Sequence, residues 1–232
     1  MNKAFTFENF VLGISNEAAV KACKKYISGD MNESVILLYG ESGNGKTHLA
    51  LACGNAAENM GKKVLCKSAQ WLSSEIYNAF FRRKKDLYKE VLPEYQKHDV
   101  LIIDDLRGLS GMEIMQEFFC ELIKSYVASG KKVILTLDKK DYKLYLEKKL
   151  SKLIQETYAV EILEPDYELL MTVLQSMEKT HEVSLSSITE EFICTQAKSV
   201  GELCGLFQRG MLLSQCLKRE IDADMIYAVL ED

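Results

Sequence analysis

The sequence predicts an α/β fold in which helices sandwich a parallel sheet, followed by a small all-helical lid. Two observations predict it: short apolar runs alternate with amphipathic stretches up to Pro165, and amphipathic stretches alone follow Pro165. Short continuous apolar runs are typical of strands that are buried on both faces of a parallel sheet. We therefore expect an α/β domain over residues 1–165 and a helical lid domain over residues 166–232.

Five apolar runs, each bounded by polar or turn residues, are the expected strands: Val35–Tyr39, Lys63–Cys66, Val100–Ile103, Val133–Leu137 and Tyr158–Ile162. Helices are expected between them at Lys46–Met60 and Met112–Ala128, because glycine follows each stretch and is common after the last turn of a helix. Alternation of strands and helices predicts right-handed crossovers that cover both faces of the sheet.

After Pro165, apolar residues recur at three- and four-residue spacing, as on one face of a helix. This spacing predicts four helices: Glu168–Met177, Thr189–Ala197, Val200–Leu217 and Asp222–Leu230. Asp222 is the expected N-cap of the last one. Trp71, Tyr77 and Phe80 recur at helical spacing in the first half and are expected to fill core, and Cys204 and Cys216 are expected to be buried thiols.

The composition and charge limit the class of protein. Hydrophobic residues make up 47% and charged residues 27%, as in ordinary globular proteins. There is no apolar run of the roughly 18 residues that span a membrane and no apolar signal core at the start, so we expect a cytoplasmic protein without membrane contact. Residues 1–165 carry a net charge of +2 and residues 166–232 a net charge of −7, so any nucleic-acid contact should come from the first part.

A glycine-rich loop lies between the first expected strand and the following helix. It has the pattern Gly-x-x-x-x-Gly-Lys-Thr and consists of Gly40, Glu41, Ser42, Gly43, Asn44, Gly45, Lys46 and Thr47. Glycines let successive backbone N–H groups point at a phosphate, and the helix N-terminus adds partial positive charge. Lys46 can then reach the β- and γ-phosphates, and the Thr47 hydroxyl can ligate Mg²⁺. The motif therefore predicts a site for ATP or ADP with Mg²⁺.

Carboxylates follow two of the expected strands. Asp104 and Asp105 end the run Val100–Ile103, where open α/β sheets bind ligands. Asp104 is expected to hold Mg²⁺ through water and Asp105 to act as the base for the attacking water. Asp138 ends the next run and could sense the γ-phosphate. The alternative is an ordinary strand-to-turn transition, in which aspartate is common.

These elements together resemble the AAA+ domain of the bacterial replication initiator DnaA, a P-loop NTPase. The matching blocks are Phe5–Asn16, Gly45–Leu49, Ile102–Leu106 and Leu135–Asp138, and Ser73–Tyr95 has the length of the initiator-specific insertion. The resemblance implies that the opening block lies beside the adenine, with Phe10, Val11, Leu12 and Asn16 as nucleotide contacts. His48 resembles the family's histidine after the loop, with packing inside the helix as the alternative role.

Two positions depart from the family pattern. Lys152, in Lys149–Leu153, stands where the resemblance implies a trans-acting arginine finger, and Gly201 stands where it implies the sensor II arginine of the lid. Lysine lacks the planar, bidentate fork of arginine, and a finger contributes about 10³–10⁵ in rate where it operates. We therefore expect a weak ATPase, with slow hydrolysis of ATP to ADP and phosphate.

The expected insertion carries four consecutive cations, Arg82, Arg83, Lys84 and Lys85, next to two phenylalanines. Cations beside aromatic rings are typical of single-strand binders, which makes these residues a candidate contact for single-stranded DNA. A solvated helix end with its phenylalanines packed inward is the alternative.

The resemblance implies a role in initiation or regulation of DNA replication. A helicase loader, a transposition loader and a nucleotide-bound adaptor with negligible catalysis are the alternative functions. Expected partners are ATP, single-stranded DNA, further copies of the chain, and a replication initiator or helicase. In the initiator family a helix-turn-helix domain would follow residue 232. The length also resembles that of the regulatory inactivator homologous to DnaA, although its glutamine-containing clamp-binding motif is not visible in Met1–Phe7.

Overall fold

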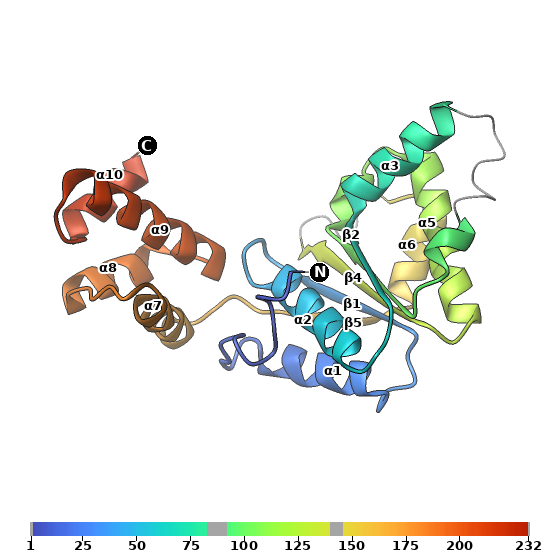
Figure 1. Ribbon diagram of the computed structural model, residues 1–232, viewed down its shortest axis with the longest axis horizontal. Coiled ribbons are helices and arrows are strands. Elements are labelled where there is room, and N and C mark those ends of the chain that lie inside the picture. The colour runs from blue at the N-terminus through green and yellow to red at the C-terminus, as the bar shows by residue number, and fades with distance from the viewer. Residues whose placement is uncertain (1, 83–91, 140–145, 232) are drawn as a thin grey trace. The chain divides into compact units, whose positions relative to one another are not determined.

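The structure is a computed structural model that describes residues 2–82, 92–139 and 146–231, the side chains of residues 78–82 and 231 excepted. The chain divides into two compact units, which are described separately (Figure 1). The first unit comprises Met1–Phe10, Ala19–Glu41 and Lys46–Ile162. The second comprises Leu163–Asp232 and two short segments from earlier in the chain, Val11–Ala18 and Ser42–Gly45.

The first unit is built on a five-stranded sheet in which every strand pair is parallel. Its strands are β1 (Val35–Gly40), β2 (Val64–Ser68), β3 (Val100–Asp104), β4 (Lys132–Asp138) and β5 (Tyr158–Glu161). They lie in the order β2-β3-β4-β1-β5. The five apolar runs of the sequence are these strands, so the predicted parallel sheet is confirmed.

Helices cover both faces of this sheet (Figure 1). One face carries α1 (Glu17–Ser28) and α2 (Lys46–Asn59), and the other carries α3 (Ala69–Arg82), α5 (Glu113–Ala128) and α6 (Lys148–Gln155). Successive strand residues contribute to different apolar clusters: Leu37 packs with α3, α5 and α6, whereas Ile36 and Leu38 pack with α1 and α2. This alternation is why the strands are apolar throughout rather than at every second position.

The second unit is helical and has its own apolar core. Its helices are α7 (Tyr167–His181), α8 (Ser187–Gln196), α9 (Val200–Leu217) and α10 (Ala223–Glu231). Each begins after a side chain that accepts a hydrogen bond from a backbone N–H three residues on, and these side chains are Asp166, Ser186, Ser199 and Asp222. Such caps satisfy N–H groups that have no partner within the helix. The predicted C-terminal helical part and its cap at Asp222 are confirmed.

Three packing predictions are wrong. Trp71 and Tyr77 were expected in the core but are 46% and 53% exposed, because they lie on the outer face of α3. Cys216 was expected to be buried but is exposed near the end of α9, and Cys204 is half-buried. The side chain of Phe80 lies outside the described residues. Within the described ranges, every helix is too short or too polar to cross a bilayer.

Candidate nucleotide-binding site

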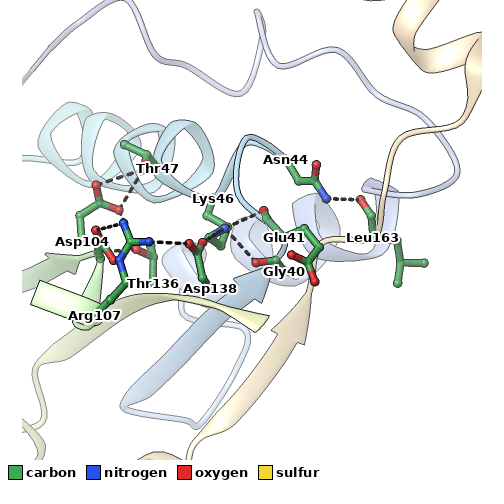
Figure 2. Close-up of polar contacts among 11 residues, drawn as sticks. Gly40, Glu41, Asn44, Lys46, Thr47, Asp104, Arg107, Thr136, Asp138 and Leu163 are labelled. Atoms are coloured by element: carbon green, nitrogen blue, oxygen red, sulfur yellow. Dashed lines mark hydrogen bonds and ion pairs between the residues drawn. The ribbon is translucent and has the colours of Figure 1, made fainter. Parts of the chain in front are cut away.

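The sheet register brings the candidate residues to one edge of the first unit. Gly40, the last residue of β1, pairs with Asp138 at the end of β4, and Asp104 ends β3 at the same edge. Carboxyl ends of parallel strands form the ligand-binding edge of open α/β sheets. Figure 2 shows the side chains of this edge facing the loop that follows β1.

The backbone of the loop has the conformation that its glycines permit. A Cβ atom on Gly40 would lie 2.3 Å from the carbonyl oxygen of Ile162, so only glycine fits there. Gly43 and Gly45 have φ values of 81° and 94°, in the left-handed region that other residues rarely adopt. Left-handed residues within such a loop turn backbone N–H groups toward one concave side, where an anion binds. The loop therefore fits a phosphate group.

Lys46 is buried at the start of α2, and its ammonium group makes three polar contacts. It donates to the carbonyl oxygens of Gly40, at 2.9 Å, and Glu41, at 2.8 Å, and forms an ion pair of 2.5 Å with Asp138 (Figure 2). An ammonium has three N–H donors, and here each has an acceptor. A bound phosphate would need one of these three donors. The donor that now pairs with Asp138 is the one that phosphate can take without breaking a hydrogen bond to the loop backbone.

Thr47 and Asp104 form the part of the site that fits a magnesium ion. The Thr47 hydroxyl lies 3.0 Å from both carboxylate oxygens of Asp104, and the Thr136 hydroxyl donates to the same carboxylate at 2.6 Å. Hydroxyl and carboxylate oxygens suit Mg²⁺, which keeps several waters and is completed by phosphate oxygens. Thr47 and Asp104 would hold the ion, which would neutralise phosphate charge there.

Asp105 has an unusual backbone conformation, with φ 56° and ψ 73°. Its N–H donates to the Thr136 hydroxyl at 2.8 Å, and its carboxylate accepts from Arg107 at 3.3 Å. A left-handed aspartate costs of order 1 kcal/mol or more, and such strain is found preferentially at functional sites. This conformation ends β3 and begins the short turn Leu106–Leu109.

The contacts join into a closed series that we call the polar ring. It runs from Lys46 through Asp138, Arg107, Asp105, Thr136 and Asp104 to Thr47, the neighbour of Lys46. Five of its members were predicted from the sequence, whereas Thr136 and Arg107 were not. Thr136 could have been recognised as a site residue, since it is the one polar residue in the run Val133–Leu137. No pattern in the sequence marks Arg107 as a site residue.

His48 follows the loop and connects α2 to the opening segment of the chain. Its Nε2 lies 3.1 Å from the Thr6 carbonyl oxygen and 3.1 Å from Asn9 Oδ1, and its ring makes edge contacts with Phe5 and Phe10. Both polar partners accept, so Nε2 carries the proton of a neutral ring. Burial lowers the pKa of His48, an effect that the hydrogen bond to Thr6 opposes in part.

The lowered pKa of His48 predicts a loss of stability in mild acid. The unfolded chain binds a proton near pH 6.5 and the folded chain only at lower pH, so the contribution is complete above about pH 6.5 and declines as the pH falls below it. Urea unfolding at about pH 7.5 and about pH 5.5 measures this. The His48→Gln variant keeps a donor for Thr6 and should lose less unfolding free energy than the wild type between these pH values; equal losses would contradict the prediction.

The other opening-block residues belong mostly to the second unit. Phe10 is buried in the first unit against His48, whereas Val11 packs on the core of the helical unit and Leu12 is 54% exposed. Asn16 is buried and orders its own loop, since its Oδ1 accepts from the Gly13 N–H and its Nδ2 donates to the Val11 carbonyl, both at 3.0 Å.

The two positions that depart from the family pattern lie in different units. Lys152 lies on α6 and lines a surface cavity with Val35 and Tyr158, which begin β1 and β5, so it is at the sheet edge opposite the polar ring. Within the second unit, the Gly201 N–H donates to the Gly43 carbonyl at 2.9 Å, and a Cβ on Gly201 would lie 2.9 Å from Gly43 Cα. Any larger residue at 201 would displace this contact.

The candidate DNA contact lies largely outside the described residues. Arg82 ends α3, but its side chain, together with Arg83, Lys84 and Lys85, lies outside the described residues. The described part of the same helix exposes Trp71 instead, with the ammonium of Lys67 3.3 Å from the centre of its ring.

Known proteins with similar sequences identify the family of this chain. The profile of the bacterial DnaA ATPase domain matches residues 1–161, most of the chain. The chain belongs to the DnaA ATPase-domain family. A DnaA replication initiator of Sulfurimonas denitrificans is 32% identical over the whole chain, and one of Geotalea uraniireducens is 30% identical. The chain covers 53% and 52% of these two proteins, so it spans about half their length.

Solved structures show how far the likeness to the DnaA family extends. Domain III of Thermotoga maritima DnaA covers the whole chain with a TM-score of 0.89, and at 23% identity it shows the AAA+ fold alone. A DnaA bound to AMPPCP and single-stranded DNA is 28% identical over 89% of the chain, which covers 64% of it, with a TM-score of 0.79. The T. maritima branch-migration motor RuvB has the same fold, with a TM-score of 0.69 and 16% identity, and the chain covers 71% of it.

Proposed function

We propose that the chain binds ATP with Mg²⁺ as the nucleotide module of a protein that acts in initiation or regulation of DNA replication. The observation that carries this is the polar ring, in which the loop residues Lys46 and Thr47 contact the strand-end acids Asp138 and Asp104, respectively. Membership of the DnaA ATPase-domain family and a relative bound to AMPPCP support it. In this function the loop amides and Lys46 hold the phosphates, and Thr47 and Asp104 hold the metal.

Hydrolysis at this site would use water as the nucleophile and Asp105 as the base, with the phosphates held by the loop and the metal. The oxygen of a water bonds to the terminal phosphorus, the bond from that phosphorus to the bridging oxygen breaks, and Asp105 takes the proton from the water. We expect turnover below about 1 per second. The reason is that Lys152 and Gly201 occupy the two positions at which the family pattern places arginines.

Calorimetric titration with ATP and Mg²⁺ tests nucleotide binding, and size-exclusion chromatography separates the candidate roles. Oligomers that form only with ATP favour an initiator-type assembly. A monomer or dimer that ignores nucleotide favours the adaptor, and capture of a replicative helicase by the purified chain favours a loader. Absence of any binding of adenine nucleotides in the titration would refute the proposed function.

A contact with single-stranded DNA is a second proposal, and it rests on Trp71. An exposed indole with a lysine ammonium over its ring offers a base a stacking surface and a phosphate a cation, the combination that single-strand binders use. The acidic charge of the chain lies in residues 166–232, so the first unit does not repel phosphates. The relative that was solved with single-stranded DNA supports this proposal.

Because Trp71 is the single tryptophan of the chain, its fluorescence reports on this surface alone. We expect oligothymidylate to quench the emission at low salt and the apparent affinity to fall steeply as salt rises. Lys67→Ala should weaken binding severalfold. Lys62→Ala, which removes an exposed lysine from the other end of β2, should leave binding unchanged. Emission that does not respond to oligonucleotide at low salt, with an ATP analogue present, would end the idea.

A further inference from the structure

The backbone of Arg107 is held in place by its neighbours, and its side chain extends outward. It lies on the short 3-10 turn η1 (Leu106–Leu109), whose two leucines are fully buried on either side of it. Gly108 lets this turn pack directly on α3, since a Cβ there would lie 2.7 Å from the Gln70 backbone nitrogen. With both leucines directed inward, the Arg107 side chain must extend from the turn toward the carboxyl edge of the sheet.

The guanidinium of Arg107 faces two acids of the polar ring. Its Nη2 lies 3.3 Å from an oxygen of Asp105. Its Nη1 lies 3.7 Å from an oxygen of Asp138 (Figure 2). The other oxygen of Asp138 is 2.5 Å from the Lys46 ammonium, so a single carboxylate separates the two cations. A phosphate that replaces Asp138 as the acceptor for the Lys46 ammonium would lie within reach of Arg107.

We propose that Arg107 contacts the terminal phosphate of ATP and so distinguishes ATP from ADP within one chain. The inference rests on the proposed function, because it needs a triphosphate in the loop. Guanidinium presents paired N–H donors that match two phosphate oxygens. Arg107 already contacts Asp138, the partner of the Lys46 ammonium, and the base candidate Asp105. It supplies in cis a guanidinium group, which Lys152 and Gly201 do not supply at the two arginine positions of the family pattern.

An ordinary surface ion pair is the competing explanation, and the geometry weighs against it. Both contacts of the Arg107 side chain are long, and 56% of the side chain is exposed. Exposed pairs of this kind stabilise a fold very little. An arginine placed between two rigid acids, with weak contacts to each, is free to turn toward a third anion. The same weakness implies that substitutions at 107 will not unfold the chain.

The test compares affinities for ADP and for the β,γ-methylene analogue of ATP by calorimetry with Mg²⁺. For Arg107→Ala we expect the affinity for the analogue to fall about tenfold and the affinity for ADP to change less than about twofold. Arg107→Gln should behave in the same way, and Arg107→Lys should keep part of the preference, since the charge remains without the fork. Lys97→Ala, which removes an exposed cation from a pair with Glu94, is the charge-matched control.

The outcomes separate the two proposals. A wild-type chain that binds neither nucleotide removes the proposed function and this inference together. A wild-type chain that binds both, with an unchanged ratio of affinities in Arg107→Ala and Arg107→Gln, overturns the inference alone. A ratio that shifts toward ATP in these variants also overturns it, because Arg107 would then restrain Asp105 and Asp138 instead of contacting phosphate. Thermal melts confirm that each variant is folded.

Discussion

The Lys46→Ala variant is expected to lose ATP binding, with an affinity at least about a hundredfold below that of the wild type. The ammonium of Lys46 is the cation at the centre of the loop, where it bonds to Gly40, Glu41 and Asp138. Hydrogen bonds to charged groups contribute about 1.5–3 kcal/mol each, and loss of two corresponds to a factor of about a hundred or more. Calorimetric titration with ATP and Mg²⁺ measures the loss.

A second variant separates binding from folding. Removing Lys46 leaves Asp138, a largely buried carboxylate, with Arg107 as its remaining cation among the described residues, which can lower stability. Lys46→Met retains the packing of the buried stem and removes only the charge. Both variants should bind ATP equally poorly while Lys46→Met melts closer to the wild type. Tight ATP binding by a folded Lys46→Met chain would refute the assignment of the loop.

Replacing Asp104 with asparagine is expected to abolish the contribution of magnesium to nucleotide binding. The carboxylate contacts the hydroxyls of Thr47 and Thr136, and an amide of the same shape can keep both contacts because hydroxyls donate and accept. The amide has no charge to hold a cation. Groups that hold a metal through water typically account for 10–100-fold in metal affinity or activity, so we expect a loss of about that size.

Titrations with ATP in the presence of Mg²⁺ and of EDTA measure this effect. Without metal, Asp104→Asn should bind ATP at least as well as the wild type, because one negative charge near the phosphates is gone. Asp99→Asn is the matched control: Asp99 precedes the same strand at its other end, where it accepts from the Lys63 N–H. If Asp104→Asn shows the same gain from Mg²⁺ as the wild type, the metal role of Asp104 is wrong.

The strands and the loop could be predicted because their signals are local. The strand β1 is apolar without interruption from Val35 to Leu38, since its residues alternate between two buried clusters. The loop was found because a phosphate site of this type needs glycine at fixed spacing from one lysine and one hydroxyl. The prediction that Trp71 lies in the core was wrong, because the direction in which a helix face points is not set by local signals. Helical periodicity identifies a face of α3 but does not say whether that face meets the sheet or the solvent.

Contacts between distant strands could not be read in the same way. Thr136 joins Asp104 to Asp105, but it lies 32 residues from the first of them and meets it only because β3 and β4 are adjacent. Arg107 is one of many charged residues that follow a strand in sequence. Its position facing Asp138 depends on the left-handed turn at Asp105 and on the packing of Gly108 against α3.

By itself, the sequence determined the order of strands and helices, the phosphate loop, and the pair of acids after β3. Each depends on residues within a few positions of one another, whose backbone preferences and polarity act locally. Only the tertiary structure decided that Lys46, Asp138 and Arg107 face one another and that Thr136 closes the ring between the acids. Those contacts depend on strand order, on register and on one strained turn, which form when the whole sheet packs between its helices.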